Sequence, residues 1–148
     1  MAGRACQAMA CARVPASAVR SPVVGWVSKK LGSRDAAGVR AAMTPKALLV
    51  VVRQRPEGGF TNTMQTGEEW LAQLEKNANA PKFEEPLTNV RVTVDSGHLA
   101  YVRADFTVVR DGKVISHGVD HFTLVKEPDG WKIAAVAYTS LPAPASTR

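Results

Sequence analysis

The chain has 148 residues, a formal net charge of +6 and no apolar run close to the length that spans a bilayer. This length predicts one domain with a hydrophobic core of its own. The positive charge is local: the first 34 residues carry six basic residues and no acid, whereas the remaining 13 basic residues are balanced by 13 acids. The neutral body offers no phosphate-binding face, so we expect neither a nucleic-acid nor a membrane partner.

Residues 1–21 are small and basic and contain no Leu, Ile or Phe, so they cannot bury enough surface to offset the entropy of ordering. We interpret them as a disordered tail. The alternatives are an organellar transit peptide, or a secretion signal cleaved near the Ala-Ser-Ala at residues 16–18. Both cysteines, Cys6 and Cys11, lie in this segment, so no disulfide is expected to support the body. A cytoplasmic location is the simplest expectation, with an organelle as the alternative.

Three segments are predicted to be helical. Residues 22–32 begin with Pro, place their Val and Leu side chains on one side and end at Gly, as an amphipathic helix does. Asp35 can cap a second helix that runs to about residue 43, where Thr-Pro breaks it. Thr66 begins the third, because Glu69 three residues later completes a capping box.

Strands account for most of the remaining chain. Residues 47–52 form a continuous apolar run, typical of a strand buried on both sides, and a short strand over 60–64 returns after a Glu-Gly-Gly turn. From residue 90 to 139 the chain reads as long strands separated by Asp-Ser-Gly, Asp-Gly and Pro-Asp-Gly, which are hairpin turn signals. Helices followed by a run of strands predict an α+β domain with the helices packed on one face of the sheet.

The order of these elements, with the residues that fill them, resembles the NTF2-like superfamily, in particular its SnoaL-like and DUF4440-type members. The matching pieces are residues 32–38, 48–53 with the Arg-Pro-Glu-Gly turn, 67–74, 99–104, 111–112, 116–120, 122–124, 130–133 and 138–139. The resemblance implies a domain over 22–141 and a loose tail over 142–148. Its fold would be a cone-shaped curved antiparallel sheet packed against about three N-terminal helices, an α+β barrel of cystatin-like type.

Members of this superfamily enclose an apolar pocket and often form dimers through the outer face of the sheet. The resemblance therefore implies a small apolar or planar ligand and a homodimer. Because the superfamily contains isomerases, dehydratases, polyketide cyclases, epoxide hydrolases and non-catalytic binders, the fold does not settle the function.

Side-chain alternation along the long strands indicates which residues line the cone. Over residues 99–109, Val102, Ala104 and Phe106 share the apolar face, which should point toward the helices. In the next strand Phe122 marks the inward face, and the same face carries Asp120. These five residues are therefore candidates for the pocket wall.

Asp120 is the sharpest catalytic candidate. A carboxyl group among apolar neighbours has a raised pKa, as a general base requires, although a purely structural carboxylate fits the same pattern. His117 can reach Asp120 if Gly118 marks a bulge; otherwise it lies on a solvated or dimer-facing surface. Tyr138 can present its hydroxyl to the same pocket as a hydrogen-bond donor.

Other candidates concern ligand binding. Trp26 and Trp70 either close the core or stack on a planar ligand, and Arg53 follows a buried strand to the rim, where an anionic group would meet it. His117 and His121 are about 13 Å apart along an extended strand, too far to share one metal ion. With no dinucleotide, phosphate-loop or zinc motif in the body, we expect neither a metal nor a cofactor.

The sequence thus predicts, first, a small-molecule-binding domain. One alternative is an acid–base enzyme of SnoaL or ketosteroid-isomerase style acting on a carbonyl-bearing substrate, with Asp120 as base, His117 as its partner and Tyr138 as oxyanion donor. Another is a protein-interaction module that uses the outer face of the sheet.

Overall fold

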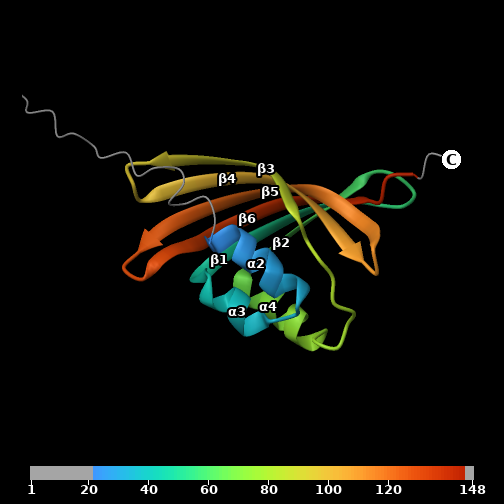
Figure 1. Cartoon of the computed structure of the whole chain (residues 1–148), viewed down its shortest axis with the longest axis horizontal. Helices are drawn as coiled ribbons and strands as arrows, with labels where there is room; N and C mark the ends of the chain where they lie inside the picture. The colour runs from blue at the N-terminus through green and yellow to red at the C-terminus, as the bar shows by residue number, and fades with distance from the viewer. Residues whose placement is uncertain (1–21, 146–148) are drawn as a thin grey trace, which may run out of the picture.

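The computed structural model describes residues 22–145, and our predictions for residues 1–21 lie outside them. The elements are α2 (Pro22–Gly32), α3 (Ala36–Ala41), β1 (Met43–Gln54), β2 (Phe60–Thr66), α4 (Gly67–Lys76), β3 (Leu87–Asp95), β4 (Leu99–Arg110), β5 (Lys113–Glu127) and β6 (Gly130–Pro142). They form one curved sheet with three helices on a single face (Figure 1). The predicted α+β class, with a curved sheet packed against three helices, is confirmed.

The strands are ordered β2-β1-β6-β5-β4-β3, and every neighbouring pair is antiparallel except β1 and β6, which are parallel. The sheet is curved but not closed, because β2 and β3 remain at its two edges. The register shifts in the β4–β5 pair after Val108 and in the β5–β6 pair after Thr123, among other pairs, and such irregularities bend a strand. The barrel expected from the resemblance is therefore an open, curved sheet.

Tight turns join the long strands where the sequence predicts them. Asp111 and Gly112 have φ values of 52° and 72°, the pair of positive angles that matches the twist of a two-residue hairpin. Ser96 and Gly97 have similar values, 51° and 70°, between β3 and β4. The hairpin signals in this part of the sequence are confirmed.

Local capping chemistry sets the starts of two helices. The Asp35 carboxylate accepts a hydrogen bond from the Gly38 amide at 2.8 Å, which caps α3. At α4 the Thr66 hydroxyl accepts from the Glu69 amide while the Glu69 carboxylate accepts from the Thr66 amide, a complete capping box. Both caps are confirmed predictions.

The prediction for β1 was wrong in two respects. The strand begins at Met43 and includes Pro45, with an irregular register before Leu48, so the Thr-Pro pair does not separate it from α3 by a break. It is also buried on one face only: Leu49 is 2% exposed whereas Leu48 is 56% exposed. A continuous apolar run is typical of a strand that is buried on both faces, but here the helices cover only one face of the sheet.

The core lies between the helices and the concave face of the sheet. Its largest fully buried side chains are Leu71, Leu124, Ile133, Val39 and Val102. The predicted inward faces of β4 and β5 are confirmed, since residues 100, 102, 104 and 106 of β4 and 118, 120, 122 and 124 of β5 are all buried. Among the described residues, none of the helices is long and apolar enough to cross a membrane.

Candidate functional site

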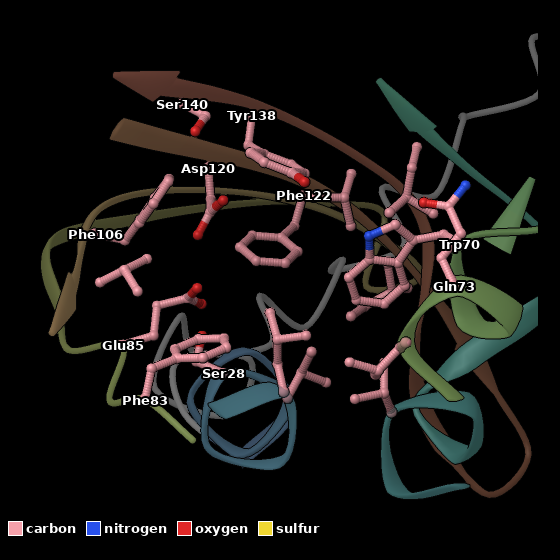
Figure 2. Close-up of a pocket in the computed structure, with 18 of the residues that line it drawn as sticks. Ser28, Trp70, Gln73, Phe83, Glu85, Phe106, Asp120, Phe122, Tyr138 and Ser140 are labelled. Atoms are coloured by element: carbon pink, nitrogen blue, oxygen red, sulfur yellow. The ribbon is translucent and has the colours of Figure 1, made fainter. Parts of the chain in front are cut away.

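A cavity of about 330 Å³ remains between the helices and the concave face of the sheet. Its walls are mainly apolar, with Phe106 and Phe122 contributed by the sheet and Trp70 by α4 (Figure 2). Exposed Arg53, together with residues 73 and 77 of the α4 region, belongs to the lining, so the cavity meets solvent there. The size is at the lower end of the range for small-molecule sites.

Two carboxyl groups face each other across this cavity. Asp120 comes from β5 and Glu85 from the connector between α4 and β3, and Figure 2 shows both carboxyls pointing into the same space. Asp120 is only 6% exposed, and within residues 22–145 its carboxyl has no hydrogen bond or ion pair. A buried polar group without a partner is costly, which marks this end of the cavity as chemically unusual.

Burial makes both groups hold their protons. Burial, and to a smaller extent the negative charge of Glu85, raises the pKa of the Asp120 carboxyl to about 8. Burial also raises the pKa of the Glu85 carboxyl to about 7, against the opposing effect of hydrogen bonding from the Ser28 hydroxyl. At neutral pH the pair therefore retains at least one proton and carries at most one full negative charge.

A phenol lies beside this pair. Tyr138 is the direct cross-strand neighbour of Asp120 in the β5–β6 ladder, so both side chains project from the same face of the sheet. Burial raises the pKa of the Tyr138 hydroxyl above its ordinary value, and the positive charge of Arg53 opposes the shift. The ring packs edge-on against Phe106 with centroids 6.3 Å apart. Tyr138 thus remains a neutral hydrogen-bond donor throughout the physiological pH range.

The position of Glu85 follows from how the connector is held. Glu84 and Val109 exchange backbone hydrogen bonds, each 2.8 Å long, which fixes this segment against β4 as an isolated bridge. Because successive extended residues point to opposite sides, Glu84 faces solvent and Glu85 faces the cavity. One residue further back, the Phe83 amide donates to the Gly32 carbonyl at the end of α2.

Most of the residues nominated from the sequence lie together. Those that line the cavity are Asp120, Tyr138, Phe106, Phe122, Trp70 and Arg53. Val102 and Ala104 are fully buried but belong to the packed interior rather than to the cavity wall. The side chain of Trp26 lies outside the described part of the chain. The functional roles given to these residues stay predictions.

His117 is not brought to Asp120. The register with β4 and with β6 does not shift between Ser116 and Thr123, so there is no bulge at Gly118 and His117 projects from the opposite face of the sheet. Gly118 is there for another reason: a Cβ at this position would overlap the Thr139 carbonyl oxygen and lie 2.9 Å from Phe106 Cε1. Close approach between β5, β6 and the Phe106 ring explains the glycine.

Sequence reasoning missed the second carboxyl group and the hydroxyl beside it. Glu85 sits in a polar connector without periodicity, so nothing local distinguishes it from the exposed Glu84. Ser28 is 4% exposed on α2, and its placement depends on how that helix docks. A signal did exist for Ser28, because a small polar residue next to Val27 interrupts the buried side of an amphipathic helix.

Comparison with solved structures gives the same fold. An NTF2-like protein with a cystatin-like fold from Novosphingobium aromaticivorans is 18% identical with a TM-score of 0.65, covering 88% of this chain and 84% of that one. A protein from the same organism, provisionally assigned as an aromatic ring hydroxylase, is 21% identical with a TM-score of 0.61, covering 87% and 89%. These likenesses show the fold alone.

A protein of unknown function from Mycobacterium tuberculosis is also similar, 16% identical with a TM-score of 0.61 over 78% of this chain; the chain spans 65% of its length. No curated protein sequence matches the chain. A family profile described as the SnoaL-like domain matches residues 31–137, from the end of α2 to β6, and includes both carboxyls of the cavity. The chain therefore belongs to the SnoaL-like domain family.

Proposed function

We propose that this domain binds a small, largely apolar molecule in the cavity, with a polar group of the ligand directed to the Asp120–Glu85 end. One observation carries the proposal: a cavity of about 330 Å³ has aromatic walls and, at one end, a buried carboxyl group without a partner among the described residues. Apolar walls supply affinity and a few converging polar groups fix orientation, as in most small-molecule sites.

A cavity-filling pair of variants tests this proposal. Val136 lines the cavity, whereas its neighbour Ala137 is paired with His121 on the outer face, so Val136→Trp should fill the cavity and Ala137→Trp should not. The probe is N-phenyl-1-naphthylamine, a neutral compound that fluoresces when it leaves water. We expect the wild type and Ala137→Trp to bind it and Val136→Trp to lose binding at least tenfold, with circular dichroism confirming that each variant is folded.

Equal probe binding by the two folded variants would place the probe elsewhere and contradict the proposal. If Val136→Trp does not fold, the comparison is repeated four residues further along β6 with Ser140→Trp and Leu141→Trp. Ser140 lines the cavity, whereas Leu141 pairs with His117 on the outer face.

Acid–base catalysis is the second candidate function. It is favoured by the raised pKa values of Asp120 and Glu85, which place proton gain and loss near neutral pH, and by the neutral phenol of Tyr138 beside them. In its ionised form Asp120 would remove a proton next to a ligand carbonyl and hold it as the carboxylic acid, while Tyr138 would donate a hydrogen bond to the enolate oxygen.

Deuterium exchange at the α-carbon of 2-tetralone, followed by proton NMR in D₂O, tests the catalytic candidate. Exchange should exceed that of buffer and disappear in Asp120→Asn, while His117→Gln should leave it unchanged because His117 lies on the other face. Exchange that survives in Asp120→Asn would remove this residue from the mechanism.

We also propose that two copies of the chain associate through the outer face of the sheet. Large apolar side chains are exposed there, including Leu48 at 56% and, on the adjoining edge strand, Met64 at 78%. Exposed apolar area of this kind is typical of interfaces. Sedimentation equilibrium should give a dimer mass for the wild type and a monomer mass for Leu48→Lys/Met64→Lys; a monomeric wild type at 100 μM would refute the dimer.

A further inference from the structure

The two carboxyl groups of the cavity have no positive partner among the residues that the structure describes. Two arginines line the cavity, but neither forms an ion pair with them. Arg34, which follows α2, donates to the Pro81 carbonyl at 3.2 Å and lies 5.1 Å from the centre of the Phe83 ring. The positive charge of Arg53, on β1, lowers the pKa of the Tyr138 hydroxyl but does not shift the pKa of the Asp120 carboxyl. The α4 wall contributes only uncharged groups from residues 70, 73, 74 and 77.

The groups around the two carboxyls are acceptor oxygens and aromatic rings, and both kinds of group favour a bound cation. Ser28 adds a hydroxyl oxygen next to Glu85, so acceptor oxygens are available from α2, from the connector and from β5. Figure 2 shows the rings of Phe83, Phe106 and Phe122 gathered around the two carboxyls. An ammonium group has three N–H donors, and aromatic faces attract positive charge.

We infer that Asp120 and Glu85 together bind the ammonium group of a small aromatic amine whose ring system fills the apolar part of the cavity. This inference rests on the proposed function, since it names the ligand class for the same cavity. A volume of about 330 Å³ limits the ligand to a compact molecule, such as a one- or two-ring aryl-alkyl amine.

Other ligand charges fit the pair less well. An anion would be repelled whenever either carboxyl group is ionised, and among the described residues no cation offsets this repulsion at the pair, because neither Arg34 nor Arg53 forms an ion pair with it. A neutral carbonyl compound could accept a hydrogen bond from the pair only when the pair is protonated, so the part of its affinity that comes from the two acids would fall as the pH rises. An ammonium ligand behaves in the opposite way, because it favours the ionised form and displaces a proton from the pair.

The test compares three ligands of nearly equal size: 1-naphthylmethylamine, 1-naphthylmethanol and 1-naphthoate. Dissociation constants are measured by isothermal titration calorimetry at pH 6, 7 and 8, in two buffers with different ionisation enthalpies so that proton release can be counted. We expect the amine to bind at least tenfold more tightly than the alcohol at pH 8, its affinity to rise at least threefold from pH 6 to 8, and naphthoate to bind most weakly. Binding of the amine at pH 7 should release a proton.

The Asp120→Asn/Glu85→Gln variant keeps the shape of the cavity and removes both acids. It should bind the amine no better than the alcohol and should bind the alcohol within about twofold of the wild type. His117→Gln, on the opposite face of the sheet, is the matched control and should behave as the wild type does. If the double variant does not fold, the single Asp120→Asn variant and the pH dependence of the wild type decide the question.

The outcomes separate this inference from the function on which it rests. If the alcohol binds the wild type as tightly as the amine, or if the amine binds without proton release, the ammonium site is wrong while the cavity remains a ligand site. Tighter binding of the alcohol at pH 6 than at pH 8 would assign the pair to hydrogen-bond donation instead and would also overturn the inference. If none of the three ligands binds, both the inference and the small-molecule function fail.

Discussion

The pH dependence of folding stability is the property that replacement of Asp120 by Asn should change most. The native state holds the Asp120 carboxyl at a pKa of about 8, whereas an unfolded chain returns it to its ordinary value of 3.8. Between these values the native state binds a proton that the unfolded state has lost. The contribution of this carboxyl group to the free energy of unfolding is therefore fully present below about pH 4, and it is lost progressively as the pH rises through 8.

The size of this effect follows from the two raised pKa values. Each pH unit over which one extra proton is held natively changes the free energy of unfolding by about 1.4 kcal/mol. From pH 6 to pH 8, Asp120 accounts for a loss of about 2 kcal/mol and Glu85, with a pKa of about 7, for a further loss of about 1 kcal/mol. The wild type should thus lose about 3 kcal/mol, and Asp120→Asn, which keeps only Glu85, about 1 kcal/mol.

Urea unfolding at pH 6, 7 and 8, followed by circular dichroism at one protein concentration, measures how the free energy of unfolding of the wild type and of Asp120→Asn depends on pH. Asp120→Asn should be less sensitive to pH than the wild type and should exceed it in stability at pH 8. His117→Gln should keep the steep wild-type dependence, because this residue is on the other face of the sheet. Parallel pH profiles for the wild type and Asp120→Asn would refute the claim that Asp120 is desolvated in the native state.

Two further predictions concern the framework. Gly118→Ala should lower the free energy of unfolding by at least about 2 kcal/mol, because its Cβ would collide with the Thr139 carbonyl and crowd Phe106. Gly25→Ala is the control: a Cβ there meets nothing, so this variant should raise the free energy of unfolding by about 0.5 kcal/mol. Similar free energies of unfolding for the two variants in urea titrations would contradict the packing argument. Thr66→Ala removes the cap of α4 and should cost about 1 kcal/mol, seen as a lower thermal midpoint; an unchanged midpoint would show that the cap contributes nothing.

The parts of the fold that sequence reasoning predicted well are those fixed by local chemistry. Asp35 and Thr66 cap their helices through groups three residues away, and the Asp111-Gly112 turn needs only its own backbone angles. The inward face of β5 was also predictable, because alternation places every second residue on one side. For β1 the same reasoning failed: an apolar run does not reveal whether one or both faces will be covered, and Leu48 is left exposed.

The candidate site was predictable only where its residues are placed by strand alternation and pairing, and not where a distant contact places them. Asp120 interrupts an apolar face and therefore stands out, and Tyr138 follows once the β5–β6 pairing is assumed. Glu85 could not be found, because its direction is set by a bridge between Glu84 and a strand residue 25 positions away. The proposed partnership of His117 with Asp120 failed because it needed a bulge, and the glycine taken as its sign serves close packing instead.

The energetic cost of the carboxyl pair is itself an argument for function. Asp120 occupies an inward position between buried neighbours, Gly118 and Phe122, where an apolar side chain would fill space without any desolvation penalty. A second acid from a distant segment then faces it, which raises the cost further. Residues that break the local rules of a fold at such a cost, without structural partners among the described residues, concentrate at functional sites. The walls around the pair are aromatic and apolar, so a ligand that carries its own polar group would supply the partner that the protein does not.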